Sequence, residues 1–417
     1  MRTLGRASAL FLGSLPGLLV PFVVVWKLSP HDADGYLYWT ALTLIVQGIL
    51  ASTLEAASIA SCARVRSRGR RPTGQAQLAV RCAGPIALIS AVAFVVVALF
   101  LRAVMSAEGT VASYALACAP VALVPPLAAV GSIYSGCLIA TGVVARPIFS
   151  TFFRGVVVLG ALVITDSVLV LSIAAVVGEA ARTTYLGTVW RRVGLGAEHE
   201  SERLHIKLSD LIAQAASMSL SMASPFVARV LLAAGPIGSV AAGEIAFRLF
   251  STATQAGNSL IVLPRISTLS GLVGDDGGDV TRGARLVRSE LRFQLLASAF
   301  LGLLWFAGAA SLWLGVSRLN DSAVSLGAAW SLILITTLPL ALGNIWAARA
   351  MLVLGRARLL LIASLVGAIS MLILSMAQTL LNVASGPIWA LAISQSLVGG
   401  LVIILVLRTV PLRSSSR

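Results

Sequence analysis

Two ionisable residues lie inside a stretch of the chain that is long enough to cross a bilayer. Glu244 and Arg248 fall within the run of residues 237–263, and their spacing places both on one face of a helix. A charge near the bilayer centre costs at least ~2.5–3.5 kcal/mol, so such residues usually pair or face a polar interior. We therefore expect either a structural ion pair that locks this helix to a neighbour, or an arginine that binds an anionic substrate group and is oriented by Glu244.

Other charged residues also fall inside apolar runs. Arg154 has no acid near enough in its own span, so we expect its partner to be an acid on another helix or a substrate anion. Glu55 could close the floor of a cavity or pair with Arg154, and Arg229 could either bind substrate or extend outward to the interface. Glu179 and Arg182 are three residues apart, which favours a structural pair. The candidate substrate-binding residues are Arg248, Glu244, Arg154, Arg229 and Glu55, and the candidates for ion coupling are Glu55 and Glu179.

These residues belong to a chain with the composition of an integral membrane protein. Hydrophobic residues make up 58% of its 417 residues, charged residues 11%, and the mean hydropathy is +0.95. The net charge of +15 comes from basic residues in short loops, which argues against nucleic acid as a partner. Apolar runs of about 18 residues or more predict an all-α fold of about twelve transmembrane helices. They lie near residues 7–26, 36–61, 82–105, 112–139, 147–165, 168–190, 206–233, 237–263, 291–315, 322–352, 358–380 and 387–408.

Loop charges predict the orientation of these spans. With the N-terminus inside, the inner segments hold 23 Arg and Lys residues and the outer segments hold 3. Because cytoplasmic loops are enriched in basic residues, both termini are predicted to be cytoplasmic. An apolar–Gly–x–(x)–Arg pattern follows the fourth and tenth spans, with Gly142 and Gly355 separated by 213 residues. This repeat suggests two pseudo-symmetric six-helix lobes, residues 1–200 and 201–417, with a site between them.

Motifs for ATP hydrolysis and metal binding are absent from the sequence. There is no GxxxxGK[ST] phosphate-binding loop, and the three histidines fall in predicted loops. The four cysteines lie in or beside spans without a CxxC spacing. We therefore expect neither an enzyme, a metal site nor a cofactor, and we expect transport to draw on an ion gradient, the membrane potential or the substrate gradient.

A family resemblance rests on the eighth span and the residues that follow it. The sequences EIAFRL (residues 244–249) and LPRIS (residues 263–267) resemble the pattern Y-A-x-R-L … L-P-x-[LI]-S. That pattern is found in lipid-linked saccharide flippases of the multidrug/oligosaccharidyl-lipid/polysaccharide exporter (MOP) superfamily. The sequences DGY (residues 34–36) and LEA (residues 54–56) look like the corresponding stretch of the first half.

The resemblance implies an alternating-access flippase with two lobes around a central cavity. Such a protein would move a polyprenyl-diphosphate-linked saccharide from the inner to the outer leaflet of a bacterial plasma membrane, and Arg248 would meet the diphosphate. Membrane lipids, and glycosyltransferases or a polymerase of the same pathway, would be its other partners. The chain departs from lipid II flippases because its first two spans lack arginine, with Gln47 in the second, and because two further C-terminal spans are missing. This favours another polyprenyl-linked glycan, with Arg154 and Arg229 supplying the charge.

Two other functions remain open on the sequence. A cation-coupled drug or small-molecule antiporter of the same superfamily commonly uses an acid in the N-terminal lobe, often in the first span, and this first span has none. Glu55 and Glu179 are the remaining acids for that role. A transport-inactive scaffold of a cell-wall glycan complex would instead show cavity charges that are all paired internally.

Overall fold

The chain folds into long apolar helices joined by short connections, as expected of an all-α integral membrane protein. The computed structural model describes residues 2–67, 70–104, 111–193, 201–204, 208–262, 265, 280–317, 322–353, 358–381 and 385–409. By its internal contacts the chain divides into two compact units. The first comprises Met1–Ala215 with Ala233–Glu244, and the second comprises Ala216–Leu232 with Ile245–Arg417. The lobe boundary predicted between residues 200 and 201 stays a prediction.

The helices of the described residues support up to ten apolar spans. Nine are individually long and apolar enough to cross a membrane, and the pair Ala323–Ile335 and Leu338–Ala348, bent by 54°, forms a tenth. The bend falls beside Pro339, within the span predicted at residues 322–352. The helices α8 (Leu208–Ala233) and α9 (Ser239–Gly257) are not among these spans, and within α8 the apolar helical segment is the shorter Met218–Ala233. The count of twelve and the cytoplasmic termini therefore stay predictions.

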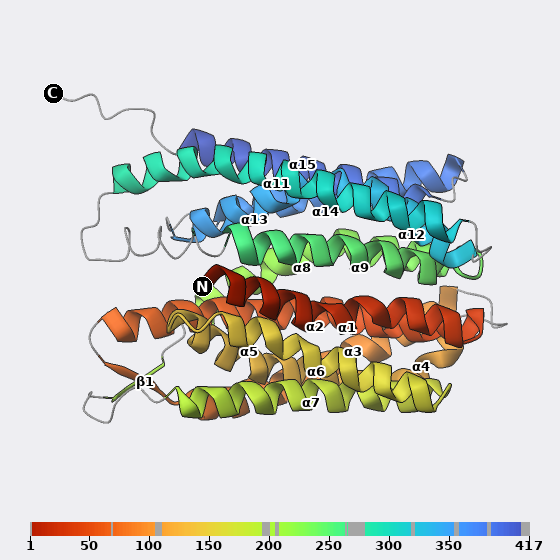
Figure 1. Ribbon diagram of the computed structural model, residues 1–417, viewed down its shortest axis with the longest axis horizontal. Helices are drawn as coiled ribbons and strands as arrows, with labels where there is room; N and C mark the ends of the chain where they lie inside the picture. Colours follow the sequence, from red (N-terminus) through yellow and green to blue (C-terminus); the bar gives the residue numbers. More distant parts are fainter. Residues whose placement is uncertain are drawn as a thin grey trace. The chain divides into compact units, whose positions relative to one another are not determined.

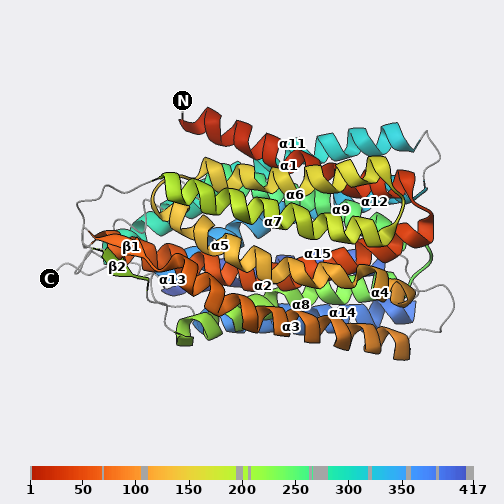
Figure 2. The ribbon, with the colours of Figure 1, turned by 90° about the horizontal axis from the view of Figure 1, so that it is seen from below.

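The first unit is built from the N-terminal helices (Figure 1). Its elements are α1 (Arg2–Lys27), α2 (Pro30–Ser67), β1 (Arg71–Thr73), α3 (Gln75–Val104), η1 (Val111–Tyr114), α4 (Ala115–Cys118), η2 (Ala119–Leu123), α5 (Val124–Ala140), α6 (Ala145–Ile164), α7 (Val168–Arg192) and β2 (Ser201–Arg203). The short helices η1, α4 and η2 interrupt the span predicted at residues 112–139, where Pro120 lies. The helices α6 and α7 follow one another after the short connection predicted at residues 165–168 and run side by side (Figures 1 and 2).

Glycines let the helices of the first unit approach closely. The helix α2 packs on α5, α1 packs on α6, and α6 packs on α7. A Cβ added to Gly136 of α5 would lie 2.5 Å from the carbonyl oxygen of Glu55, and one added to Gly155 of α6 would lie 2.5 Å from the amide nitrogen of Gly17. Small residues at such contacts are the usual means of helix packing in membranes, where dispersion contacts take over from the hydrophobic effect.

A short parallel β-ladder, which the sequence analysis did not predict, joins two connecting segments of the first unit. Strand β1 pairs with β2, and Pro72 lies opposite Glu202. Arg70 forms an ion pair with Glu202 at 3.4 Å, and the hydroxyl of Thr73 donates to the Glu202 carbonyl at 3.2 Å. The ladder ties the connection between α2 and α3 to the segment that precedes α8.

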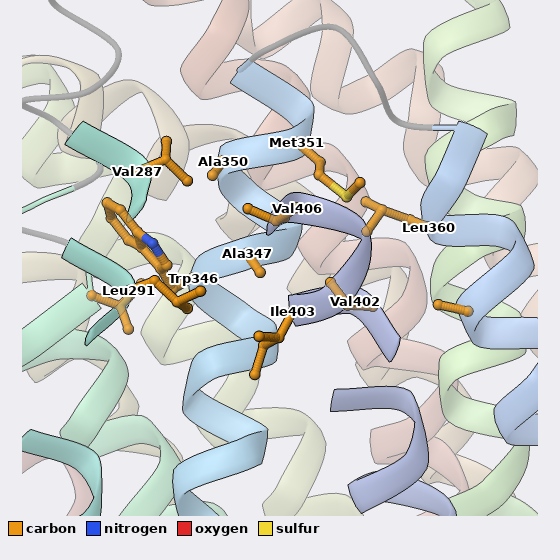
Figure 3. Close-up of a cluster of buried hydrophobic side chains, with 12 residues drawn as sticks. Val287, Leu291, Trp346, Ala347, Ala350, Met351, Leu360, Val402, Ile403 and Val406 are labelled. Carbon is orange, nitrogen blue, oxygen red and sulfur yellow. The ribbon is translucent and has the colours of Figure 1, made fainter. Parts of the chain in front are cut away.

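The second unit contains the C-terminal helices around one large apolar cluster. Its elements are η3 (Asn258–Val262, a π-helical segment), α11 (Val280–Val316), α12 (Ser322–Ile335), α13 (Leu338–Val353), α14 (Arg358–Leu381) and α15 (Gly386–Thr409), together with most of α8 and α9. Trp346 of α13 is fully buried beside Leu291 of α11, and Met351 extends toward Leu360 (Figure 3). Val262 of η3 belongs to the same cluster.

Serine hydroxyls connect three helices of the second unit. Ser224 of α8 and Ser394 of α15 are 2.9 Å apart, and Ser221 of α8 lies 3.0 Å from Ser364 of α14. Residues 211–225 of the sequence are rich in small and polar side chains, which could line a wet cavity or allow close packing. Ser224 and Ser394 are buried and bonded to each other, so at this position they serve packing.

Candidate functional site

One carboxylate and two guanidinium groups meet inside the first unit. Glu179 of α7 is fully buried, and its Oε1 accepts a hydrogen bond from Arg182 Nη1 at 2.5 Å. Its Oε2 lies 3.7 Å from Nη1 of Arg154 on α6. That second distance is an ion-pair contact but too long for a hydrogen bond. The structure therefore provides the pair predicted for Glu179 and Arg182, and it assigns to Arg154 an acid on another helix.

Two neutral side chains hold the arginines of this cluster in place. Arg154 Nη1 donates to Gln47 Oε1 of α2 at 2.9 Å, and Arg182 Nε donates to the hydroxyl of Ser150 at 3.3 Å. Gln47 lies in the second predicted span, which lacks the arginine that lipid II flippases carry there. The amide oxygen thus orients a guanidinium supplied from α6, which sequence spacing could not show because the two residues are 107 positions apart.

The charges of this cluster do not balance. Arg154 and Arg182 carry two positive charges and Glu179 carries one negative charge, which leaves an excess of one positive charge within apolar spans. Arg182 holds the shorter contact and its side chain is 11% exposed, whereas the Arg154 side chain is 23% exposed. Because a guanidinium has five N–H donors, Arg154 keeps donors to offer an anion. Arg154 is thus the member of the cluster that is suited to bind an incoming oxyanion.

The close approach of α6 and α7 depends on Gly178. A Cβ at this position would lie 2.9 Å from the Cα of Arg154. We expect Gly178→Val to push the two helices apart and to destabilise the protein by ~1–3 kcal/mol, as overpacking does elsewhere. The measurement is the melting temperature of the purified protein in detergent. Gly160→Val on α6 is the control, since a Cβ there meets no atom within 4 Å; equal melting temperatures for both variants would contradict the expectation.

Glu55 lies elsewhere in the first unit. The hydroxyl of Ser135 on α5 donates to Glu55 Oε2 at 3.2 Å, across the close contact between α2 and α5. The acid beside Arg154 is Glu179, so the pairing of Glu55 with Arg154 that the sequence left open is not the one that the structure shows. Glu55 keeps its candidate roles as a substrate-facing or ion-coupling carboxylate.

Glu244 and Arg248 both lie on α9, one helical turn apart. Glu244 is buried with 4% exposure, and Arg248 is half-buried. The hydroxyls of Ser251 and Thr252 donate to the backbone carbonyl of Arg248 at 3.1 Å and 2.8 Å. The hydroxyl groups of Ser251 and Thr252 thus lie in the helix turn that follows Arg248. Of the LPRIS motif, only Arg265 lies within the described residues.

Arg229 of α8 packs over an aromatic ring of the second unit. Its guanidinium carbon lies 4.4 Å above the ring centroid of Phe247, and Nη1 lies 3.4 Å from the carbonyl oxygen of Pro225. The sequence allowed an outward-extending side chain here. A cation–π contact instead holds the half-buried guanidinium against α9, next to the turn that bears Arg248.

Asp34 of α2 has a structural role that sequence reasoning missed. Its two carboxylate oxygens accept the backbone N–H groups of Gly238 at 2.7 Å and Ala241 at 2.8 Å, at the N-terminus of α9. Gly238 adopts a φ of +89°, which favours glycine. An anionic cap suits this helix end because its first N–H groups are unpaired and the helix dipole is positive there. A helix beginning in an apolar span needs such a cap, but the sequence does not reveal that it comes from a residue 204 positions away.

Asp34→Ala should therefore loosen the start of α9. Removing a helix cap costs ~0.5–2 kcal/mol, and we expect a lower melting temperature together with faster hydrogen exchange at the amides of residues 238–241. Asp166→Ala is the control, because Asp166 forms an exposed ion pair with Lys27 that is worth little. Unchanged exchange at these amides in Asp34→Ala would show that the cap does not hold the helix.

No protein-family model matches this sequence, and no curated protein matches it. Solved structures share its fold over nearly the whole chain. An inward-facing multidrug resistance MATE transporter of the MOP superfamily superimposes with a TM-score of 0.68 at 12% identity, covering 98% of both chains. The lipid II flippase MurJ in its inward closed conformation gives a TM-score of 0.69 at 13% identity, covering 96% of this chain and 87% of that one.

A third similar structure concerns the charge of the binding pocket. It is a MOP superfamily transporter from Pyrococcus furiosus, with a TM-score of 0.64 at 12% identity over 98% of this chain and 95% of that one. It is described as having a binding pocket of reversed polarity, which suggests a different function. This chain is therefore a multi-pass membrane protein with the fold of MOP-superfamily transporters, a fold that both drug transporters and a lipid flippase adopt.

Proposed function

We propose that this protein is an alternating-access flippase that moves a polyprenyl-diphosphate-linked saccharide from the inner to the outer leaflet of a bacterial plasma membrane. Two findings support the proposal. The fold is shared with a lipid II flippase, and the cluster of Glu179, Arg154 and Arg182 in the first unit holds one more positive than negative charge. A diphosphate is an anion that could balance that charge on entering the protein.

The observation that carries the proposal is the position of Arg154. Its guanidinium is held by Gln47 and partly paired with Glu179, yet it retains exposure and unused donors. Arginine binds phosphate oxygens through two parallel N–H···O bonds, which fits the planar fork to a diphosphate. On binding, Arg154 would exchange its long contact with Glu179 for the substrate, while Arg182 keeps Glu179 compensated.

Helix α9 would contribute Arg248, with Glu244 orienting it, and α8 would contribute Arg229 beside Phe247. We assign Arg248 to the diphosphate and leave Glu55 as a substrate-facing carboxylate. Glu179 is less suited to ion coupling than the sequence suggested, because its carboxylate already forms a hydrogen-bonded ion pair with the guanidinium of Arg182. A cation that bound there would have to compete with a hydrogen-bonded ion pair.

A direct test uses proteoliposomes that contain undecaprenyl-diphosphate-linked N-acetylglucosamine with a fluorescent NBD label on the sugar. Dithionite bleaches only the NBD label in the outer leaflet. A flippase brings inner-leaflet lipid to the outer leaflet, so the bleached fraction rises above the initial outer-leaflet fraction. NBD-labelled phosphatidylethanolamine is the control cargo. The function is supported if the labelled saccharide lipid is bleached well beyond that fraction while the control lipid is not, and is contradicted if liposomes with and without protein behave alike.

Arg248→Ala is expected to abolish this transport while the protein still inserts and expresses. The reason is that no other group on α9 supplies a guanidinium at that depth, and Arg248→Lys should retain only part of the rate because lysine lacks the bidentate fork. The measurement is the initial bleaching rate at matched protein density. Wild-type rates from Arg248→Ala would remove Arg248 from the substrate site.

The similar TM-scores of the MATE transporters favour one alternative, a cation-coupled antiporter of drugs or small molecules. The same proteoliposomes distinguish it. An antiporter would accumulate ethidium when a proton or sodium gradient is imposed and would leave the saccharide lipid in place. A scaffold of a cell-wall glycan complex would do neither.

A further inference from the structure

A stripe of polar side chains follows Arg248 along one face of α9. Successive residues of an α-helix are rotated by about 100°, so Ser251, Thr252 and Gln255 lie within about 60° of the direction of Arg248. All four belong to the span predicted at residues 237–263. Gln255 is exposed and the other three are half-buried. One face of this helix therefore presents a guanidinium, two hydroxyls and an amide.

The other side of α9 is apolar and packs inside the second unit. Ala253 is fully buried in a cluster that contains Leu342 of α13. The indole nitrogen of Trp305 on α11 donates to the carbonyl oxygen of Leu249 at 3.0 Å. These contacts fix the rotation of α9 about its axis. The stripe that contains Gln255 is therefore turned away from the apolar core of the second unit.

An exposed amide within a membrane span needs water or a polar ligand. Among the residues that the structure describes, none forms a hydrogen bond with the side chain of Gln255. Lipid tails offer neither donors nor acceptors, so an amide that faced them would lose the hydrogen bonds that it makes to water. We infer that this face of α9 meets an aqueous space, which a polar substrate can enter.

The chemistry of the stripe matches the hydroxyl groups of a neutral sugar. Ser251 and Thr252 each donate to the carbonyl oxygen of Arg248. A hydroxyl has one proton to donate and two acceptor lone pairs, so both keep the capacity to accept. The amide of Gln255 both donates and accepts. Residues 249–262 contain no charged side chain, so this surface suits an uncharged ligand that is rich in hydroxyls.

Distances along the helix suit a sugar that is joined to a diphosphate. With a rise of 1.5 Å per residue, Ser251 and Thr252 lie ~4.5–6 Å beyond Arg248 along the helix axis, and Gln255 lies ~10 Å beyond it. In the proposed substrate the first sugar is bonded directly to the diphosphate, so its hydroxyls fall beside the stripe. In the predicted orientation α9 runs from outside to inside, which places the stripe on the cytoplasmic side of Arg248, from which this substrate would enter.

We propose that Ser251, Thr252 and Gln255 form the saccharide-binding part of the substrate site, with Gln255 as the main determinant of affinity for the sugar. The inference rests on the proposed function, because it places the diphosphate at Arg248. It goes further by assigning the sugar to one face of α9 and by naming its class, a neutral saccharide.

The experiment compares two lipids that differ only in the sugar. Undecaprenyl diphosphate and undecaprenyl-diphosphate-linked N-acetylglucosamine are titrated separately into the purified full-length protein in detergent, and the bound fractions are measured by native mass spectrometry. We expect the wild type to bind the glycosylated lipid about tenfold more tightly, as one or two additional hydrogen bonds would provide. Equal affinities would overturn the saccharide site and leave the proposed function standing. Binding of neither lipid would contradict both.

Matched variants locate the sugar. Gln255→Leu and Thr252→Val should each lower the affinity for the glycosylated lipid about two- to tenfold, because each removes hydrogen bonding to the sugar. Both should bind undecaprenyl diphosphate like the wild type. Thr254→Val is the control, because Thr254 also donates to the carbonyl four residues earlier, that of Phe250, but lies about 100° around the helix from Gln255. It should bind both lipids like the wild type.

The sugar-free lipid separates a sugar contact from a structural effect. If Gln255→Leu lost affinity for both lipids equally, or for neither, the proposal would be overturned. Should Gln255→Leu fold poorly, Gln255→Asn decides. Asparagine keeps the amide on a shorter side chain, so it should weaken binding of the glycosylated lipid alone.

Discussion

Replacement of Arg154 by glutamine is expected to slow transport of the diphosphate-linked lipid about 10- to 100-fold, because charge-assisted hydrogen bonds contribute ~1.5–3 kcal/mol. Glutamine keeps the length and some hydrogen bonding to Gln47 but loses the charge and the fork. Glu179 should stay compensated through Arg182, so the protein should fold. The measurement is the initial dithionite bleaching rate of the labelled saccharide lipid.

Two variants on the same helix sharpen this expectation. Arg154→Lys keeps the charge without the bidentate geometry, so we expect a rate between those of the wild type and Arg154→Gln. Arg146→Gln is the control, since Arg146 is exposed at the start of α6 and lies 3.3 Å from the Tyr185 hydroxyl. An unaltered rate for Arg154→Gln would assign the cluster a purely structural role. An equal loss in Arg146→Gln would point to a general effect of lowering the positive charge.

Glu179→Gln should have the largest effect on stability. The carboxylate is fully buried and is the only acid that contacts Arg154 and Arg182 among the described residues. Removing one partner of a buried ion pair typically costs ~3–5 kcal/mol, because the remaining charge stays buried without compensation. The melting temperature in detergent should fall clearly below that of the wild type. The fall should exceed that caused by Asp166→Ala at the exposed ion pair with Lys27.

A second substitution tests the physical reason for that loss. Glu179→Gln combined with Arg182→Gln removes one charge of each sign, so it should recover much of the stability that Glu179→Gln loses. Coupled residues of this kind deviate from additivity by about 0.5–3 kcal/mol. If the double variant were as unstable as the sum of the two single variants, uncompensated charge could not be the cause.

Local composition predicted the membrane class, whereas the MOP-type fold was implied by the resemblance of residues 244–249 and 263–267 to a family pattern. Long apolar runs must become helices in a bilayer, since each backbone group needs an internal partner there. The helices on either side of residues 165–168 followed from apolar lengths alone. The pair Glu179–Arg182 was also predictable, because its residues are neighbours on one helix face.

Contacts between distant residues were beyond the reach of the sequence. From the sequence, Arg154 could pair with Glu55, with another acid or with a substrate anion. The packing of α6 against α7 at Gly178 places Glu179 beside it. Arg229 could extend to the interface or turn inward, and the ring of Phe247 on a neighbouring helix decided its direction. The parallel β-ladder in which Pro72 lies opposite Glu202 was not predictable, because strands of three residues are too short to show an alternating pattern.

Hydropathy and charge thus determined by themselves that this protein is a multi-pass helical membrane protein with ionisable groups inside its spans, because the cost of placing a charge in lipid is set residue by residue. Tertiary structure alone decided which of those charges cancel. It gave Arg154 a hydrogen bond to Gln47 and a long ionic contact to Glu179, and it placed Asp34 on the N-terminus of α9. The physical reason is that charge balance and hydrogen bonding depend on distances between helices, which no local pattern in the sequence records.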